Sequence, residues 1–124
     1  MMTANEIGTI ILNCAFKVHT ALGPGLLEST YEACLEYELK KAGLKVERQK
    51  VLPVIYDNLM LDAGYRIDLL VENKVIIENK AVQKMNEIYF AQLLTYLKLA
   101  DLQLGYLINW NVRNLKNGIR RVVN

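Results

Sequence analysis

The sequence predicts an α/β fold in which helices flank a mixed central β-sheet, with the element order ααβββαββ. Apolar residues recur every three or four positions near the start of the chain and again over about 86–100, which indicates amphipathic helices. Between these segments, short runs of β-branched and apolar residues are typical of strands. A strand–helix–strand unit over 75–108 implies a parallel right-handed crossover, so the sheet is expected to be mixed.

The first helix is expected to begin at a capping box, because Thr3 and Glu6 have the required spacing. Its apolar face comprises Ile7, Ile10, Ile11, Cys14, Val18 and Leu22. The Gly-Pro-Gly run at 23–25 ends this helix. A residue before proline avoids helical geometry, and glycine tolerates a positive φ.

A second helix is expected over about 27–42. Ser29 and Glu32 are candidate capping residues at its start, because their side chains can accept hydrogen bonds from the first turn. Gly43 stands where a glycine commonly follows the last helical turn. The short Gly-Pro-Gly connection therefore joins two helices that follow each other directly in the chain.

The pattern then changes to strands. Residues 46–56 are predicted to form an edge strand, because Pro53 cannot donate to a ladder, and the Asp-Asn pair at 57–58 marks a turn. The other expected elements are strands over 64–71 and 75–80, a helix over 86–100, a strand over 104–110, a loop over 111–118 and a strand over 119–123.

The composition restricts the classes of function. A chain of 124 residues is expected to form one domain, residues 1–124. With 52% apolar and 23% charged residues, intrinsic disorder is excluded. The net charge of +2 leaves nucleic-acid binding to a local basic patch, such as the basic stretches at 40–50 and 113–121. Cys14 and Cys34 lack partners at zinc-ligand spacing, so we expect two reduced thiols.

No targeting or membrane segment is expected. Residues 1–6 contain no Lys or Arg, so they lack the basic region of a signal peptide. The first apolar stretch is interrupted by Asn13 and Lys17, and no run approaches the roughly 18 apolar residues of a membrane span. We therefore predict a cytoplasmic protein that does not insert into a membrane.

The strongest candidate site lies in the hairpin formed by residues 64–71 and 75–80. If its turn is centred on Asn73, Asp68 lies opposite Glu78, and the residues that share their face are Arg66 and Lys80. The other face, which is expected to enter the core, carries Ile67, Leu69, Val75 and Ile77. Two like charges across a ladder repel each other. A divalent cation between them would reverse this penalty, and carboxylate oxygens are the ligands that Mg²⁺ or Mn²⁺ prefers.

The alternative is a solvated face with diagonal salt bridges, Arg66 to Glu78 and Asp68 to Lys80. Exposed pairs of this kind are common and contribute about 0–1 kcal/mol each. A slip of one residue in the turn would remove the pairing of the two carboxylates. It would still leave Glu78 and Lys80 on one face of their strand.

Three motifs resemble those of a known nuclease superfamily. Asp68, followed ten residues later by Glu-Asn-Lys at 78–80 and then by a helix, resembles the PD-(D/E)xK nuclease superfamily. The run 25–31, Gly-Leu-Leu-Glu-Ser-Thr-Tyr, resembles the signature of the GxxExxY family within it. Gln92 and Tyr96 resemble the QxxxY motif that follows the core hairpin in several branches. The likeness runs over nearly the whole chain and implies a restriction-endonuclease-like core.

The resemblance implies a Mg²⁺- or Mn²⁺-dependent nuclease that hydrolyses phosphodiester bonds of DNA or RNA. The implied metal ligands are Asp68, Glu78, the backbone carbonyl of Asn79 and Glu28. The implied catalytic residues are Asp68, Glu78, Lys80, Gln92 and Tyr96. Lys80 is expected to orient or activate the attacking water, and the Gln92–Tyr96 pair, on one helix face, to position the site or a phosphate.

Two positions depart from the superfamily pattern. Ile67 stands where the superfamily's name has a proline, and the middle residue of the Glu-x-Lys run is polar Asn79 on the buried side of a central strand. A buried amide without partners costs about 1–3 kcal/mol, so the Asn79 side chain is expected to find partners.

Alternatives remain for individual residues and for the function. Glu28 also fits the preference for an acid at a helix N-terminus. Tyr31 also fits a packed aromatic side chain with a hydrogen-bonded hydroxyl, and His19 also fits a histidine that makes a structural hydrogen bond. The chain could instead be a non-catalytic module that binds nucleic acid or protein on a nuclease-like scaffold. Because 124 residues leave little room for a recognition domain, a homodimer or a partner subunit is expected to supply specificity.

Overall fold

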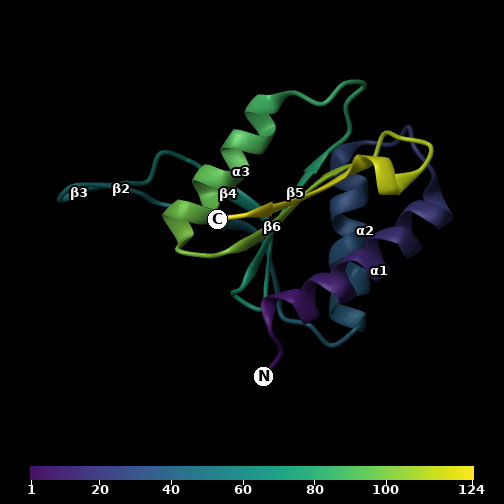
Figure 1. The fold of residues 1–124 in the computed structure, drawn as a ribbon, viewed down its shortest axis with the longest axis horizontal. Helices are drawn as coiled ribbons and strands as arrows, with labels where there is room; N and C mark the ends of the chain where they lie inside the picture. Colours follow the sequence, from purple (N-terminus) through teal and green to yellow (C-terminus); the bar gives the residue numbers. More distant parts are fainter.

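The computed structural model, which describes residues 1–124, contains a five-stranded sheet with helices on both faces (Figure 1). In spatial order the strands are β1 (Val46–Val51), β4 (Arg66–Val71), β5 (Val75–Lys80), β6 (Leu104–Asn109) and β7 (Ile119–Val123). β5 and β6 are parallel, and every other neighbouring pair is antiparallel. The parallel pair is connected through α3 (Glu87–Ala100), which confirms the mixed sheet and the crossover.

Helices α1 (Ala4–Leu22) and α2 (Glu28–Lys41) precede the sheet. α1 begins at the predicted capping box: the Glu6 amide donates to the Thr3 hydroxyl at 3.2 Å, and the Thr3 amide donates to the Glu6 carboxylate at 3.1 Å. It ends at Gly23, whose φ of 69° lies in the region that favours glycine. None of the helices combines the length and apolar character that a membrane crossing requires.

Both faces of the sheet are buried. α1 and α2 pack on one face, where the core includes the fully buried Leu35, Val75 and Trp110. α3 packs on the other face through Leu93 and Leu97. Because side chains of β5 enter both cores, a charged side chain within this strand, such as that of Glu78, is withdrawn from water whichever face it lies on.

The start of α2 differs from the expectation. The N-cap residue is Leu27, and no side chain accepts a hydrogen bond from the first turn, so the predicted capping by Ser29 or Glu32 is wrong. Glu32 lies in the second turn and is buried, with 5% of its surface exposed. Its carboxylate bonds to side chains of β1 and β5, which satisfy it better than the helix end would.

The largest difference lies in the expected strand over 46–56, which is two strands. The chain leaves the sheet after β1 and forms a separate hairpin of β2 (Val54–Tyr56) and β3 (Leu59–Leu61). Pro53, which has no amide to donate, lies at the break. We call residues 52–65 the arm; the Leu52 amide donates to the Tyr65 carbonyl at 3.0 Å and closes its base. The observed order is ααβββββαββ, and the expected loop at 111–118 contains the short 3₁₀ helix η1 (Leu115–Gly118).

The register of the β4–β5 hairpin agrees with a turn centred on Asn73, since Val71 pairs with Val75 and Leu69 with Ile77. Of the four residues expected on one core-facing side of the hairpin, Leu69, Val75 and Ile77 enter the α1–α2 core as predicted. The prediction is wrong for Ile67, which packs on the α3 side. Strict alternation of faces is not enforced here, because the β4–β5 ladder ends at the Leu69–Ile77 pair and the β1–β4 ladder is interrupted at Gln49, opposite Asp68.

Candidate functional site

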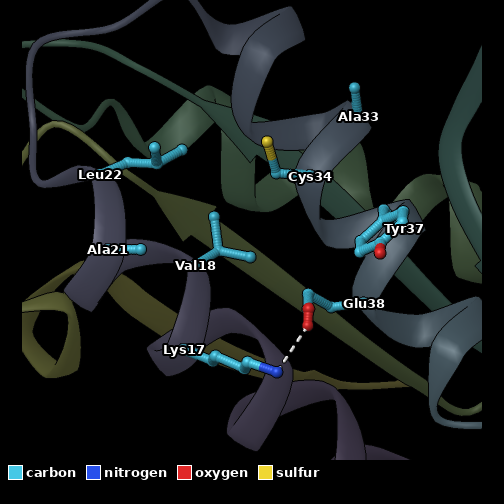
Figure 2. A pocket seen from close by; sticks show the side chains of 8 residues that line it. All are labelled: Lys17, Val18, Ala21, Leu22, Ala33, Cys34, Tyr37 and Glu38. Carbon is cyan, nitrogen blue, oxygen red and sulfur yellow. Dashed lines mark ion pairs between the residues drawn. The ribbon is translucent and has the colours of Figure 1, made fainter.

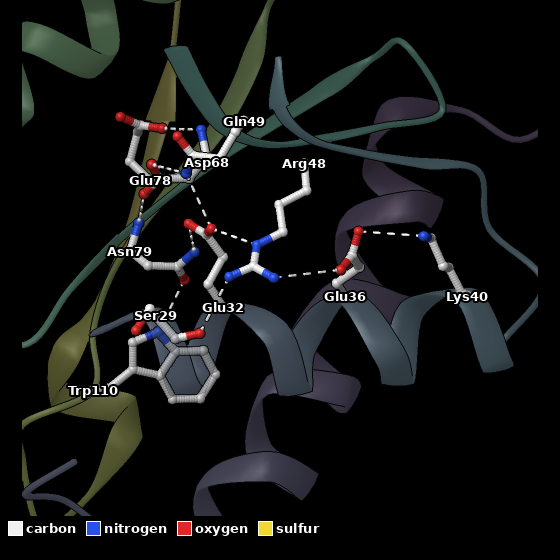
Figure 3. Close-up of polar contacts among 10 residues, drawn as sticks. All are labelled: Ser29, Glu32, Glu36, Lys40, Arg48, Gln49, Asp68, Glu78, Asn79 and Trp110. Carbon is white, nitrogen blue, oxygen red and sulfur yellow. Dashed lines mark hydrogen bonds and ion pairs between the residues drawn. The ribbon is translucent and has the colours of Figure 1, made fainter. Parts of the chain in front are cut away.

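Asp68 and Glu78 meet where the β4–β5 ladder ends, one residue beyond the Leu69–Ile77 pair. The Asp68 amide donates to Glu78 Oε2 at 2.8 Å, and the Asn79 amide donates to Asp68 Oδ2 at 2.8 Å (Figure 3). Each carboxylate is therefore held by the backbone of the opposite strand. The structure brings together the two acids that the sequence placed face to face.

The two carboxylates have no cationic partner. Glu78 is 5% exposed and Asp68 is partly buried. Neither of the salt bridges of the alternative interpretation forms: Arg66 pairs with Asp62 at 3.7 Å instead, and Lys80 is in no ion pair. The solvated face with diagonal salt bridges is therefore wrong for this hairpin.

Burial makes both carboxyls hard to ionise. It raises the pKa of Glu78 to about 8, and the charge of Asp68 acts in the same direction. Burial also raises the pKa of Asp68 to about 6, although the hydrogen bond from the Asn79 amide opposes this change. Burial and mutual repulsion therefore oppose the simultaneous ionisation of the two carboxyls near neutral pH.

Glu32 is a third acid at the site, and sequence reasoning assigned it only a capping role. Its Oε2 accepts hydrogen bonds from Arg48 Nε at 2.8 Å and from Gln49 Nε2 at 3.0 Å (Figure 3). Its charge contributes to the raised pKa of Asp68 and of Glu78. One signal was available: Glu32 follows Glu28 by four residues, which places both on one face of α2.

The side chain of Asn79 finds the partners that its burial requires. Its Oδ1 accepts a hydrogen bond from Trp110 Nε1 at 2.9 Å, and its Nδ2 donates to Glu32 Oε1 at 3.5 Å. The Trp110 ring stacks on Tyr31 with the ring centroids 5.0 Å apart. Asn79 therefore links the end of β5 to α2 and to the end of β6, and the polar residue in the Glu-x-Lys run is structurally satisfied.

The loop before α2 is fixed by Tyr31. Its hydroxyl donates to the Gly23 carbonyl at 2.6 Å and accepts from the Leu26 amide at 3.1 Å. Gly25 between them has a φ of 101°, which a residue with a side chain rarely adopts. Glu28 is the first residue of α2. Partial burial raises the pKa of Glu28, and the charge of Lys80 acts against this change.

Lys80 ends β5, two residues after Glu78. Its Nζ lies 4.6 Å from the centroid of the Tyr89 ring, in a cation–π contact with α3. The charge of Lys80 lowers the pKa of both Glu78 and Glu28, so the ammonium lies close enough to act on both carboxyls.

Of the QxxxY pair, Tyr96 lies nearer to the carboxylates. It is 6% exposed, and burial raises its pKa, with the charge of Glu78 acting in the same direction. Its ring meets Tyr65 edge-on at 6.2 Å between centroids. Gln92, one turn earlier on α3, lines a groove of about 480 Å³ with Tyr96. The Gln92 side chain is half-buried.

The sequence of the chain matches a family model described as PD-(D/E)XK nuclease superfamily over residues 5–122. The chain belongs to the PD-(D/E)XK nuclease superfamily. Comparisons with curated proteins and with solved structures gave no match. The match confirms the resemblance at the level of the superfamily, and the mixed sheet with helices on both faces confirms the restriction-endonuclease-like fold class.

The donor set suits a hard divalent cation, as in other members of the superfamily, but it is small. No group of three or more His, Cys, Asp or Glu side chains is arranged to hold a metal ion, so Glu28 does not complete a three-acid cluster with Asp68 and Glu78. Two carboxylates and the Asn79 carbonyl remain. All three are oxygen donors, and Mg²⁺ commonly takes one or two protein carboxylates and completes its shell with water.

The basic residues and the apolar groove between α1 and α2 contribute less to the site. Arg48 lies at the site, but its guanidinium is bound to Glu32. Arg120 stacks on Phe90, and Arg121 donates to Asn5. A groove of about 330 Å³ between α1 and α2 (Figure 2) is mostly apolar and is bordered by the Lys17–Glu38 ion pair. It contains no pair of unneutralised acids, so it is not the candidate site.

Proposed function

We propose that residues 1–124 form a single domain that hydrolyses phosphodiester bonds of nucleic acid with a bound Mg²⁺ or Mn²⁺. One observation carries the proposal: the carboxylate of Glu78 is buried against Asp68, and no Lys or Arg pairs with either acid. Such a buried charge pair is costly unless something positive is bound. Membership of a nuclease superfamily supports the class of reaction.

In this proposal the cation is held by Asp68, Glu78 and the Asn79 carbonyl. When bound, it supplies Lewis-acid polarisation of the phosphate and a water of lowered pKa. The chain's own part is positional, because the backbone amides of Asp68 and Asn79 fix the orientation of the two carboxylates. Near neutral pH, both carboxyls are deprotonated together only when a cation offsets their mutual repulsion.

Lys80 orients the attacking water and stabilises the charge that develops on the phosphate. The Tyr89 ring beneath its Nζ holds the ammonium without neutralising it. Tyr96 and Gln92 position the phosphate from α3. The hydroxyl of Tyr96 remains a neutral hydrogen-bond donor, because its pKa lies above the ordinary value.

We further propose that the chain is a member of the GxxExxY family. The three named positions have distinct structural tasks, which supports this assignment: Gly25 allows the turn, Tyr31 closes it, and Glu28 begins α2 on the side of Lys80. In this proposal Glu28 acts on the cation through an intervening water. The cytoplasmic location stays a prediction from the sequence.

A cleavage screen tests the proposed function. Plasmid, linear duplex, single-stranded DNA and RNA are incubated with wild type and Glu78→Gln, each with Mg²⁺, Mn²⁺ or EDTA. We expect wild type to cleave at least one substrate, and Glu78→Gln or EDTA to abolish cleavage. The matched control is Glu87→Gln, whose carboxylate on α3 is 86% exposed and should not matter.

Other outcomes have definite meanings. Equal cleavage by Glu78→Gln contradicts the assigned site. If calorimetry finds that wild type binds Mg²⁺ or Mn²⁺ but cleaves nothing, the non-catalytic binding module replaces the nuclease. If wild type binds neither cation, the proposed metal site is wrong.

A further inference from the structure

The arm projects from the body of the molecule beside α3 (Figure 1). Its β2–β3 ladder has three residue pairs, and no third strand extends it. Its most exposed apolar side chains are Ile55 at 57%, Tyr56 at 75%, Leu59 at 53% and Met60 at 69%. A two-stranded hairpin of this length is marginally stable alone in water. The arm therefore exposes a large apolar surface in a form that has little stability of its own.

Neither face of the arm is polar. The register pairs Tyr56 with Leu59 and Ile55 with Met60. Since side chains alternate along each strand, the first pair lies on one face and the second on the other. The arm cannot bury an apolar face and present a polar face to solvent, so at least one apolar face remains exposed unless a partner covers it.

The charges of the arm favour a protein partner over nucleic acid. Residues 52–65 contain no Lys or Arg, and their two charged residues are Asp57 and Asp62. Natural sheet edges are commonly protected by Lys, and this edge has none. The affinity of proteins for a nucleic-acid backbone comes mainly from Lys and Arg, and the two aspartates would repel a phosphate backbone. The partner is therefore expected to bury apolar side chains.

The same molecule offers an apolar recess beside the base of the arm. The groove of about 480 Å³ lies between the arm and α3, and its apolar lining includes Val54, Tyr65, Ile88 and Leu99. Ile88 itself is 62% exposed at the rim. A projecting apolar element and an apolar recess on one chain provide the two halves of a self-complementary, two-fold interface.

We propose that a second copy of this chain covers the arm, with the arm of each copy lying in the groove between the arm base and α3 of the other. Seven side chains, at roughly 100 Å² each, would bury roughly 700 Å² of apolar surface per copy, close to the about 800 Å² per partner of a stable interface. The seven side chains are those of Ile55, Tyr56, Leu59, Met60, Leu61, Tyr65 and Ile88. Gln92 and Tyr96 also line this groove, so the arm of the second copy lies beside the two residues that the proposed function assigns to the phosphate, while the dimer itself depends on the apolar contacts and not on the cation.

The oligomeric state of the full chain tests the proposal. Light scattering coupled to size exclusion, over a hundredfold range of concentration, should give twice the chain mass of 14.2 kDa. The double variant Tyr56→Lys/Met60→Lys places charge on both faces of the arm. It should raise the dimer dissociation constant by at least about thirtyfold, as expected for central interface residues. The control is Tyr37→Lys on α2, where the tyrosine is similarly exposed at 64%.

A cross-linking experiment tests the arrangement itself and does not rely on the charged variant. A chain with Met60→Cys is mixed with a chain with Ile88→Cys, both with Cys34→Ser to remove the half-buried thiol. We expect a disulfide-linked heterodimer under mild oxidation. A monomer at every concentration overturns the proposal, and so does a dimer that Tyr37→Lys disrupts but the arm variant does not. A dimer without the Met60–Ile88 cross-link overturns the placement of the arm in the groove.

Discussion

The backbone amide of Asp68 donates to the carboxylate of Glu78 at 2.8 Å, in place of the ladder hydrogen bond that ends one residue earlier. This hydrogen bond stands where the regular pairing of the two strands has ended, and it brings the Asp68 and Glu78 carboxylates to one site. It uses only Oε2 of Glu78, and the other oxygen of this carboxylate has no hydrogen-bond donor in the protein. The backbone thus holds in place two acids that no side-chain cation pairs with.

Glu78→Gln should raise the thermal stability of the cation-free protein at pH 8 and abolish cation binding. The amide keeps an oxygen for the Asp68 hydrogen bond and removes the buried negative charge. Thermal melts and calorimetric titration with Mg²⁺ measure the two effects. Glu87→Gln, on the exposed side of α3, should change stability by less than about 0.5 kcal/mol. A Glu78→Gln protein with a lower melting temperature than wild type would mean that the Glu78 carboxylate stabilises the cation-free protein.

The stability of the cation-free protein should fall as pH rises from about 5 to about 8. In the unfolded chain both carboxyls titrate near pH 4, whereas the folded values are about 6 for Asp68 and about 8 for Glu78. Over this window the folded state binds more protons than the unfolded state, so raising the pH favours unfolding.

The control for this pH dependence is the same series with saturating Mg²⁺. The cation binds the deprotonated pair, so it should stabilise the protein more at pH 8 than at pH 5.5. A flat melting temperature over this window in the absence of cation would contradict the raised pKa of Glu78. A Mg²⁺ effect independent of pH would place the cation elsewhere.

Lys80→Met should preserve cation binding and lower the cleavage rate by about a hundredfold or more. Methionine keeps the apolar stem against Tyr89 and removes only the ammonium. Single-turnover cleavage at saturating Mg²⁺ gives the rate, and calorimetry gives the cation affinity. Lys84→Met, four residues further along in an exposed loop, is the matched control. Unchanged cleavage by Lys80→Met would remove this residue from the mechanism.

Asn79→Leu should destabilise the fold by about 1–3 kcal/mol, because Trp110 Nε1 loses its buried acceptor and Glu32 loses a donor. Urea denaturation of the cation-free protein measures this loss. The double variant Asn79→Leu/Trp110→Phe should lose less stability than the two single losses added together, since both substitutions break the same hydrogen bond. Full additivity would show that the Asn79–Trp110 hydrogen bond contributes nothing.

Part of the site could be predicted because it depends on local spacing. A short turn centred on Asn73 fixes which residues of the hairpin are opposite each other, so the meeting of Asp68 and Glu78 follows from counting along the chain. The capping box at Thr3 and the glycine after α1 are also local, and both were predicted. The five-stranded sheet follows from strand spacing and from the handedness of the crossover.

The rest depends on distant contacts that spacing does not encode. Glu32 has the sequence context of a capping acid, and only the packing of α2 against β1 brings it to Arg48 and Gln49. The apolar pattern runs on through Pro53, so the sequence does not show that the chain leaves the sheet there. The displacement of Ile67 to the α3 side accompanies an interruption of the β1–β4 ladder at Gln49, a residue in another strand.

The chain has a single tryptophan, and its indole is fully buried with its N–H bonded to the residue that follows Glu78. Its fluorescence therefore reports on one place only, the junction of β5, β6 and α2 beneath the two acids. A change in the position of β5 would alter the polarity around the indole and move its emission maximum. The native protein thus carries an optical probe next to the candidate site and needs no attached dye.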